Sequence, residues 1–331
     1  MKKLSIAIIL ILSILILAAC GSSAKSDFTP FWGQINKDSA DGNGVLEYSE
    51  YKISVAPPLK DAGGNVIETG TYKLDSDSCS GSYSIEISRI SKGRYKVKTE
   101  FEFKGKYTKD GTLTSEFTDS YTGECIFEIV PPEKINMISS KKTVSNATFC
   151  NEDGSLSKVS YTVTNTYEDS KIFSKFDITE DKDNLLKDCK SSFEQGGLGE
   201  YFFDNEALYT AIRAFKPKEG FSLGFKVPEN ISQTIYSMSA SYVEQKEENM
   251  FSLDIGGQKL SSHLIQVVRT GTGKVGAPIK LYYSKDDKVT YQLDTGTKVV
   301  TQYFRLLKFE HGDMIYTLDA DKYLNSALKK T

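Results

Sequence analysis

The chain has 331 residues, with 41 Lys and Arg against 44 Asp and Glu, so its formal net charge is −3. Removal of Lys2 and Lys3 with an N-terminal leader would take two positive charges from −3 and leave −5. A mildly acidic chain without a clustered basic face is not typical of nucleic-acid binding, which depends on Lys and Arg side chains that neutralise phosphates. Two histidines and no Cys-x-x-Cys pair argue against a zinc site.

The N-terminus has the layout of an export signal. Lys2 and Lys3 precede an almost wholly apolar run from Leu4 to Leu17, which small residues then close. A membrane-spanning helix needs about 20 apolar residues, and this run is shorter. An uncleaved anchor and an ordinary signal peptide are both open for this run.

The sequence Leu17-Ala18-Ala19-Cys20 resembles the end of a bacterial lipoprotein signal. In such signals the Cys thiol receives a diacylglyceryl group and the peptide is cut just before it. The resemblance implies a signal peptide over residues 1–19, lipidation of Cys20 and a polar tether over 20–44. It also places the folded part at the extracytoplasmic face of the cell membrane, held there by lipid.

Four cysteines follow Cys20, and four cysteines in an exported chain allow three disulfide pairings. Cys125 and Cys150 fall in segments that we expect to form neighbouring strands, which favours a pair between them. Cys79 would then pair with Cys189. Free thiols are the alternative.

The dominant hydrophobic period is two, which predicts strands with one face on a core and the other in water. Tyr95, Val97, Thr99, Phe101 and Phe103 alternate with charged residues, and segments 83–88 and 159–167 repeat the pattern. Glycine-containing turns such as Lys92-Gly93 and Asp153-Gly154 separate the runs. Later strands are expected at 221–227, 235–243, 249–255, 259–269, 279–284, 289–293, 298–309 and 314–318.

The residue pattern of two segments predicts a helix. Asp204 can cap a central helix over 204–215, whose apolar stripe needs a surface to cover. Asp319 or Asp321 can open a C-terminal helix over 319–331, and a weaker helical pattern covers 182–193. The expected fold is therefore mainly β: a strongly curved antiparallel sheet or half-barrel over 45–318, with the central helix across its concave face.

The run from Tyr201-Phe202-Phe203-Asp204 to Ala214, together with Tyr283-Ser284-Lys285-Asp286, resembles an uncharacterised family of exported bacterial proteins. In that family an acidic residue opens the only helix of a curved antiparallel sheet. Its fold is similar to that of lipoprotein carriers, whose half-barrels hold acyl chains. The resemblance implies this fold for residues from about 45 to 310 and transfers no catalytic residue.

Residues 39–50 resemble an EF-hand calcium loop. Asp41, Asn43 and Glu50 stand at the third, fifth and twelfth positions, and Gly44 at the sixth, where the sharp turn needs glycine. Ser39 occupies the first position, where an Asp is usual, and no helix is expected on either side. A calcium site and a polar turn before the first strand are both open.

A Ser–His hydrolase would need a nucleophile and an orienting acid beside His263, and we expect none. The lipid anchor and the β scaffold favour a non-enzymatic surface lipoprotein that binds a ligand or a protein partner at the cell envelope, without a cofactor other than the possible calcium ion. Two alternatives remain: an envelope enzyme acting on cell-wall polymer through paired carboxylates, and a lipid carrier.

Overall fold

A computed structural model describes residues 44–57, 72–109, 112–130, 134–247, 250–271, 277–285, 288–293, 296–301 and 304–323. The predicted signal peptide, Cys20 and most of the tether lie outside these residues, as do Asp41 and Asn43. Among the residues that are described, every helix is too short or too polar to cross a membrane.

Long strands make up most of the described chain. They are β1 (Gly44–Val55), β2 (Lys73–Leu74), β3 (Ser80–Ser91), β4 (Arg94–Lys109), β5 (Thr112–Val130), β6 (Lys134–Cys150), β7 (Leu156–Glu168), β8 (Lys171–Asp181), β9 (Ser192–Gln195), β10 (Ser222–Glu229), β11 (Thr234–Val243), β12 (Ser252–Ile255), β13 (Gln258–Thr270), β14 (Ile279–Ser284), β15 (Lys288–Leu293), β16 (Gly296–Thr301), β17 (Leu306–His311) and β18 (Met314–Leu318).

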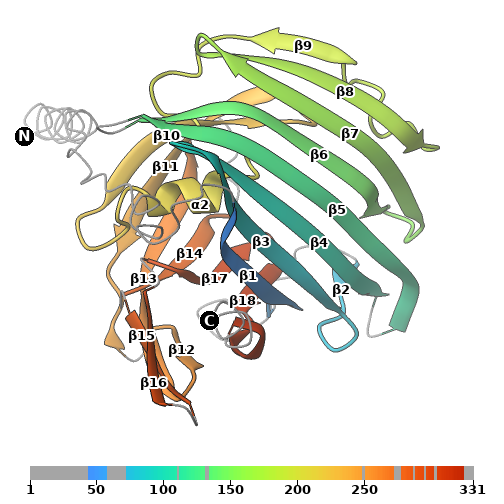
Figure 1. Ribbon diagram of the computed structural model, residues 1–331. Coiled ribbons are helices and arrows are strands. Elements are labelled where there is room, and N and C mark those ends of the chain that lie inside the picture. Colours follow the sequence, from blue (N-terminus) through green and yellow to red (C-terminus); the bar gives the residue numbers. More distant parts are fainter. Residues whose placement is uncertain are drawn as a thin grey trace, which may run out of the picture.

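Nearly all of these strands form one antiparallel sheet, in the order β10-β11-β13-β14-β17-β18-β1-β3-β4-β5-β6-β7-β8-β9. β2 adds to β4, β12 adds to β13, and β15 and β16 form a separate hairpin. The sheet bends round the short helix α2 (Leu208–Arg213), as Figure 1 shows. Right-handed strand twist accumulates along strands of this length, so such a sheet curls rather than staying flat. The predicted fold class is confirmed.

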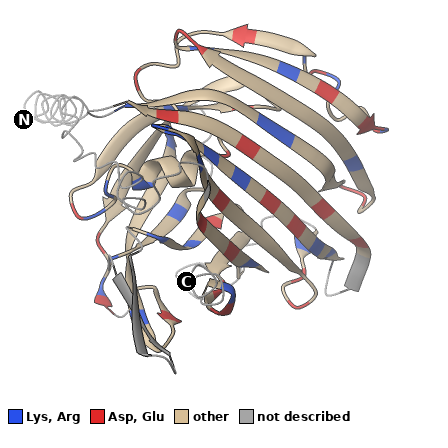
Figure 2. Ribbon diagram, viewed as in Figure 1, with Lys and Arg blue, Asp and Glu red and all other residues tan. Residues whose placement is uncertain are grey.

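The inner face of the sheet carries the core. In β4, Tyr95, Val97 and Phe103 are buried and face inward, while the alternating Lys and Glu side chains face water. Figure 2 shows both signs of charge interspersed along the strands. One large apolar cluster joins this face to the residues around α2, and a smaller one lies on β6, β7 and β8 around Tyr161 and Phe176.

The helices are shorter than the sequence predicted. The central helix covers Leu208–Arg213 rather than 204–215, and Ala207, not Asp204, stands at its N-cap. The Asp204 side chain instead accepts a hydrogen bond from the Glu206 N–H at 2.9 Å, in a turn before the helix. Segment 182–193 forms turns that lead into β9, not a helix.

The C-terminal helix is described only over 320–323, and residues 324–331 lie beyond the described part. Asp319 opens it, because its Oδ1 accepts hydrogen bonds from the N–H groups of Asp321 and Lys322 at 3.2 and 3.4 Å. The strand predicted over 298–309 divides into β16 and β17. Phe304 between them has a φ of 49°, a left-handed conformation that ends an extended run.

The predicted disulfides are wrong, since Cys79, Cys125, Cys150 and Cys189 are free thiols. Cys125 and Cys150 do lie on neighbouring strands, but Cys125 faces Ser140 in the ladder. Cys150 is ten residues further along β6, about 33 Å away at 3.3 Å per residue, whereas a disulfide needs Cα atoms within about 7 Å. The Cys79 and Cys189 thiols donate to different carbonyls, those of Lys106 and Ile231.

Because these thiols are unpaired, reductant should change neither the melting temperature nor the alkylation pattern. Iodoacetamide added to the unfolded protein without reductant should modify all four of these cysteines, as read by mass spectrometry. A mass short of two or four carbamidomethyl groups, restored by dithiothreitol, would contradict the free-thiol assignment.

Candidate functional site

A segment that we call the crossing segment, residues 198–215, runs inside the curved sheet from its β9 side to its β10 side. The Leu198 N–H donates to Ser170 O in the β7–β8 turn at 3.2 Å. Phe202 then forms a parallel bridge with Lys226 of β10. The segment therefore joins the two ends of the sheet order, and its last part contains α2, in which almost every side chain is buried.

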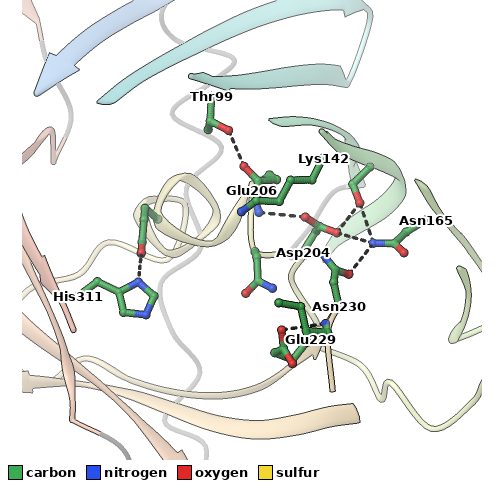
Figure 3. Close-up of polar contacts among 12 residues, drawn as sticks. Thr99, Lys142, Asn165, Asp204, Glu206, Glu229, Asn230 and His311 are labelled. Carbon is green, nitrogen blue, oxygen red and sulfur yellow. Dashed lines mark hydrogen bonds and ion pairs between the residues drawn. The ribbon is translucent and has the colours of Figure 1, made fainter. Parts of the chain in front are cut away.

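Asp204 fixes the middle of the crossing segment to the sheet. Its Oδ2 atom accepts hydrogen bonds from Ser140 Oγ at 2.5 Å and from the Tyr167 hydroxyl. It also accepts one from Asn165 Nδ2 at 3.4 Å, as Figure 3 shows. Asn165 also donates a hydrogen bond to Asn230 Oδ1 at 3.3 Å. Asn230 lies in the β10–β11 turn, so this turn belongs to the same hydrogen-bond network. Burial raises the pKa of the Asp204 carboxyl above its usual range, while the hydrogen bonds from Ser140 and Tyr167 oppose the rise.

Glu206 makes a second buried contact with the same face. Its Oε1 lies 2.9 Å from Lys142 Nζ, and its Oε2 accepts a hydrogen bond from Thr99. The Lys142 ammonium also lies 3.9 Å from the centroid of the Tyr121 ring. Burial alone would lower the pKa of Lys142, but the Glu206 carboxylate raises it above its usual value. The charge on Glu206 is thus compensated inside the protein.

The strand register explains why this site forms. Thr99, Gly123 and Lys142 face one another across β4, β5 and β6, so they share one row of the inner face. A Cβ atom at Gly123 would overlap with Glu206 Oε2 and Thr99 Oγ1. The missing side chain at Gly123 is therefore what leaves room for the Glu206 carboxylate.

A third group of buried polar contacts, made of ion pairs, holds the other end of the crossing segment. Arg213 of α2 forms two hydrogen bonds with the Glu47 carboxylate, at 2.8 and 3.1 Å. Arg305 lies 3.7 Å from Glu47 and donates to Ser49 Oγ at 2.7 Å. Burial by itself would raise the pKa of Glu47, but the two guanidinium groups outweigh it and hold the pKa at about 2.

All three buried carboxylates already have hydrogen-bond partners within the protein. Asp204, Glu206 and Glu47 are at most 8% exposed, and each accepts hydrogen bonds from at least two other residues. Such carboxylates can position a segment, whereas a general acid or base must reach a substrate proton. The arrangement is therefore suited to holding α2 and the crossing segment in place.

Two histidines and one serine motif lie away from this network. His311 Nδ1 is 3.0 Å from the Tyr209 hydroxyl, and His263 packs edge-to-face against Tyr242. The sequence Gly220-Phe221-Ser222-Leu223-Gly224 matches a Gly-x-Ser-x-Gly pattern, but it enters the strand β10 rather than a strand-to-helix turn. Ser222 is exposed and its neighbour Leu223 is buried, so Ser222 faces away from the core.

Of the predicted calcium ligands Asp41, Asn43 and Glu50, the first two lie outside the described residues, and Glu50 lies in a strand rather than in a loop. Positions six to twelve belong to the strand β1, which spaces the seventh position, Val45, about 17 Å from Glu50. Ligands in an EF-hand must converge within about 2.6 Å of one ion. Glu50 instead pairs with Lys322 and accepts a hydrogen bond from Tyr48 at 3.3 Å. Within the described residues, no three His, Cys, Asp or Glu side chains gather as a metal site requires.

Sequence reasoning missed the residues of the buried network. The available signal was a polar residue on the inward-facing side of an alternating strand. Thr99 stands between Val97 and Phe101, and Asn165 between Val163 and Tyr167. The short Asp-x-Glu sequence at 204–206 supplies the acidic partners, although the sequence does not show which strands they meet.

No family model matches the sequence, and no curated protein matches it. Among solved structures, the chain is similar to a crystal structure of a beta-barrel-like protein of the domain of unknown function DUF1849 from Brucella abortus. The match covers 82% of this chain and 94% of that one, at 12% sequence identity and a TM-score of 0.40.

Replacement of Gly123 by Ala should destabilise the protein by about 3 kcal/mol, because the new methyl group would displace the Glu206 carboxylate from a packed site. Gly224→Ala is the matched control, since no atom lies within 4 Å of a Cβ at that position. Urea unfolding measures both. Equal stability of the two variants would show that Gly123 makes no room for Glu206.

Stability should fall steeply in acid because of Glu47. The folded pKa of about 2 lies below the ordinary 4.5, so Glu47 stabilises the fold above about pH 4.5 and this contribution disappears as pH falls towards 2. The shift corresponds to about 3 kcal/mol. Glu47→Gln should lose this stability at pH 7 and flatten the dependence on pH between 2 and 5.

Glu128→Gln is the control for Glu47, because the Glu128 pair with Arg94 is exposed and 3.6 Å long. Urea unfolding at several pH values measures all three proteins. The same acid dependence in wild type and Glu47→Gln would rule out Glu47 as its source.

Proposed function

We propose that this chain is a non-enzymatic, membrane-anchored surface lipoprotein that binds a ligand or a protein partner at the cell envelope. The observation that carries the proposal is Leu17-Ala18-Ala19-Cys20 behind a charged and apolar leader. Two or more acyl chains hold a protein stably at a membrane, at roughly 0.8 kcal/mol for each buried methylene. Lipid on Cys20 would therefore suffice as an anchor.

The interior of the sheet supports binding on the outer surface rather than within the sheet. The crossing segment and α2 occupy the concave side, and Phe203, Ala211 and Phe215 are at most 1% exposed in the main apolar cluster. Side chains that already fill an interior leave little apolar surface for an acyl chain. This favours surface binding over the lipid-carrier alternative.

The burial of the acidic pair Asp204 and Glu206 supports a non-enzymatic role. A hydrolase acting on wall polymer needs two carboxyl groups that flank a bound glycosidic bond. Asp204 and Glu206 are close in sequence, but both are buried and held by Ser140, Tyr167, Thr99 and Lys142. We therefore assign both carboxylates a structural role.

The anchor can be tested by metabolic labelling of cells that express the full chain. The wild-type protein should incorporate radiolabelled palmitate, because the thiol of Cys20 is the proposed acylation site. The labelled protein should sediment with membranes. Cys20→Ala should lose the label and leave the membrane fraction. Cys189→Ala is the control, since a cysteine outside the signal should leave labelling unchanged. Unlabelled wild type, or firm membrane attachment of Cys20→Ala, would refute the anchor.

A further inference from the structure

A shallow groove of about 480 Å³ lies on the outer face of the sheet, across β7, β8 and β9. Six of its lining residues form two short rows. Phe173 of β8 lies between Thr166 and Glu194, and Lys175 lies between Thr164 and Ser192. Neighbouring strands are about 4.8 Å apart and alternate residues on one strand about 7 Å apart. These six residues therefore form a grid of roughly 10 by 7 Å.

The centre of the groove is an exposed aromatic ring. Phe173 is 37% exposed, whereas the next residue, Ser174, faces the interior and is 4% exposed. Side chains with hydroxyl or charged ends surround the ring, and all five are exposed. A flat apolar surface edged by hydrogen-bonding groups fits a ligand that has an apolar face and a polar rim.

The cations around the groove are paired with anions. Lys171 lies 2.8 Å from Glu194, and Lys175 lies 3.3 Å from Asp177. Glu168 also faces Lys171 across the β7–β8 ladder, so two cations meet three anions, and an anionic polymer or a phosphate group would find no electrostatic complement. The grid is also far smaller than the roughly 800 Å² that each partner contributes to a stable protein interface. Charge and size together favour a small neutral ligand.

We propose that this groove binds one or two rings of a neutral saccharide. This proposal names the ligand class for the binding role proposed above, and it rests on that role. The C–H face of a pyranose ring would pack on Phe173. Its hydroxyl groups would donate to Glu194 and exchange hydrogen bonds with Thr164, Thr166 and Ser192, and Lys175 would donate to a ring or hydroxyl oxygen.

Saturation-transfer difference NMR on the purified full-length protein tests the proposal, with the neutral tetrasaccharides of N-acetylglucosamine and of glucose as probes. Wild type should transfer saturation to the sugar ring protons of at least one probe. Phe173→Ala should weaken binding about tenfold, because the ring contributes the apolar platform. Phe173→Tyr should retain binding, because the aromatic face remains.

Phe149→Ala is the matched control, since Phe149 is also exposed, at 42%, but lies on β6 outside the groove. Its binding should equal that of wild type, and thermal melting should show all variants folded. Absence of transfer to both probes, equal binding by Phe173→Ala, or equal loss in Phe149→Ala would overturn the saccharide site. The palmitate experiment reads the anchor independently, so failure of one proposal does not imply failure of the other.

Discussion

The burial of two carboxylates two residues apart, Asp204 and Glu206, is the constraint on which the rest of the structure depends. A charge can remain inside a protein only if partners compensate for the water that it loses. Asp204 takes donors from β6 and β7, and Glu206 takes them from β4 and β6. The sheet from β4 to β7 must therefore curve round the crossing segment at one place, and this requirement fixes how deeply α2 is buried.

The crossing segment also joins the two halves of an open sheet. Arg213 reaches Glu47 of β1, while Phe202 bridges to β10 and Leu198 bonds to the β7–β8 turn. Nearby, the Gln233 side chain makes hydrogen bonds of 3.0 and 2.7 Å with the backbone of Lys190. An open sheet exposes two edges that can pair with other chains, and these contacts occupy part of that backbone.

The buried network was only partly predictable. Alternation in β4 identifies Thr99 as inward-facing, and the residues around Lys142 also suggest a strand, so polar groups on the inner face could be expected. Their partners could not, because Glu206 is 107 residues from Thr99 and meets it only through the fold. The disulfide prediction was wrong for the same reason: strand neighbours were foreseen, but the register that separates Cys125 from Cys150 was not.

Local chemistry by itself determined the strands, their inward and outward faces and most turns, since each depends on residues close together in the chain. Tertiary structure decided the length of α2, the division of segment 298–309 at Phe304, and the placement of Asp204 in a polar network rather than at a helix cap. Those outcomes depend on burial and on partners from distant strands. A side chain such as Asp204 takes the hydrogen bonds that the folded interior offers, and no local pattern records them.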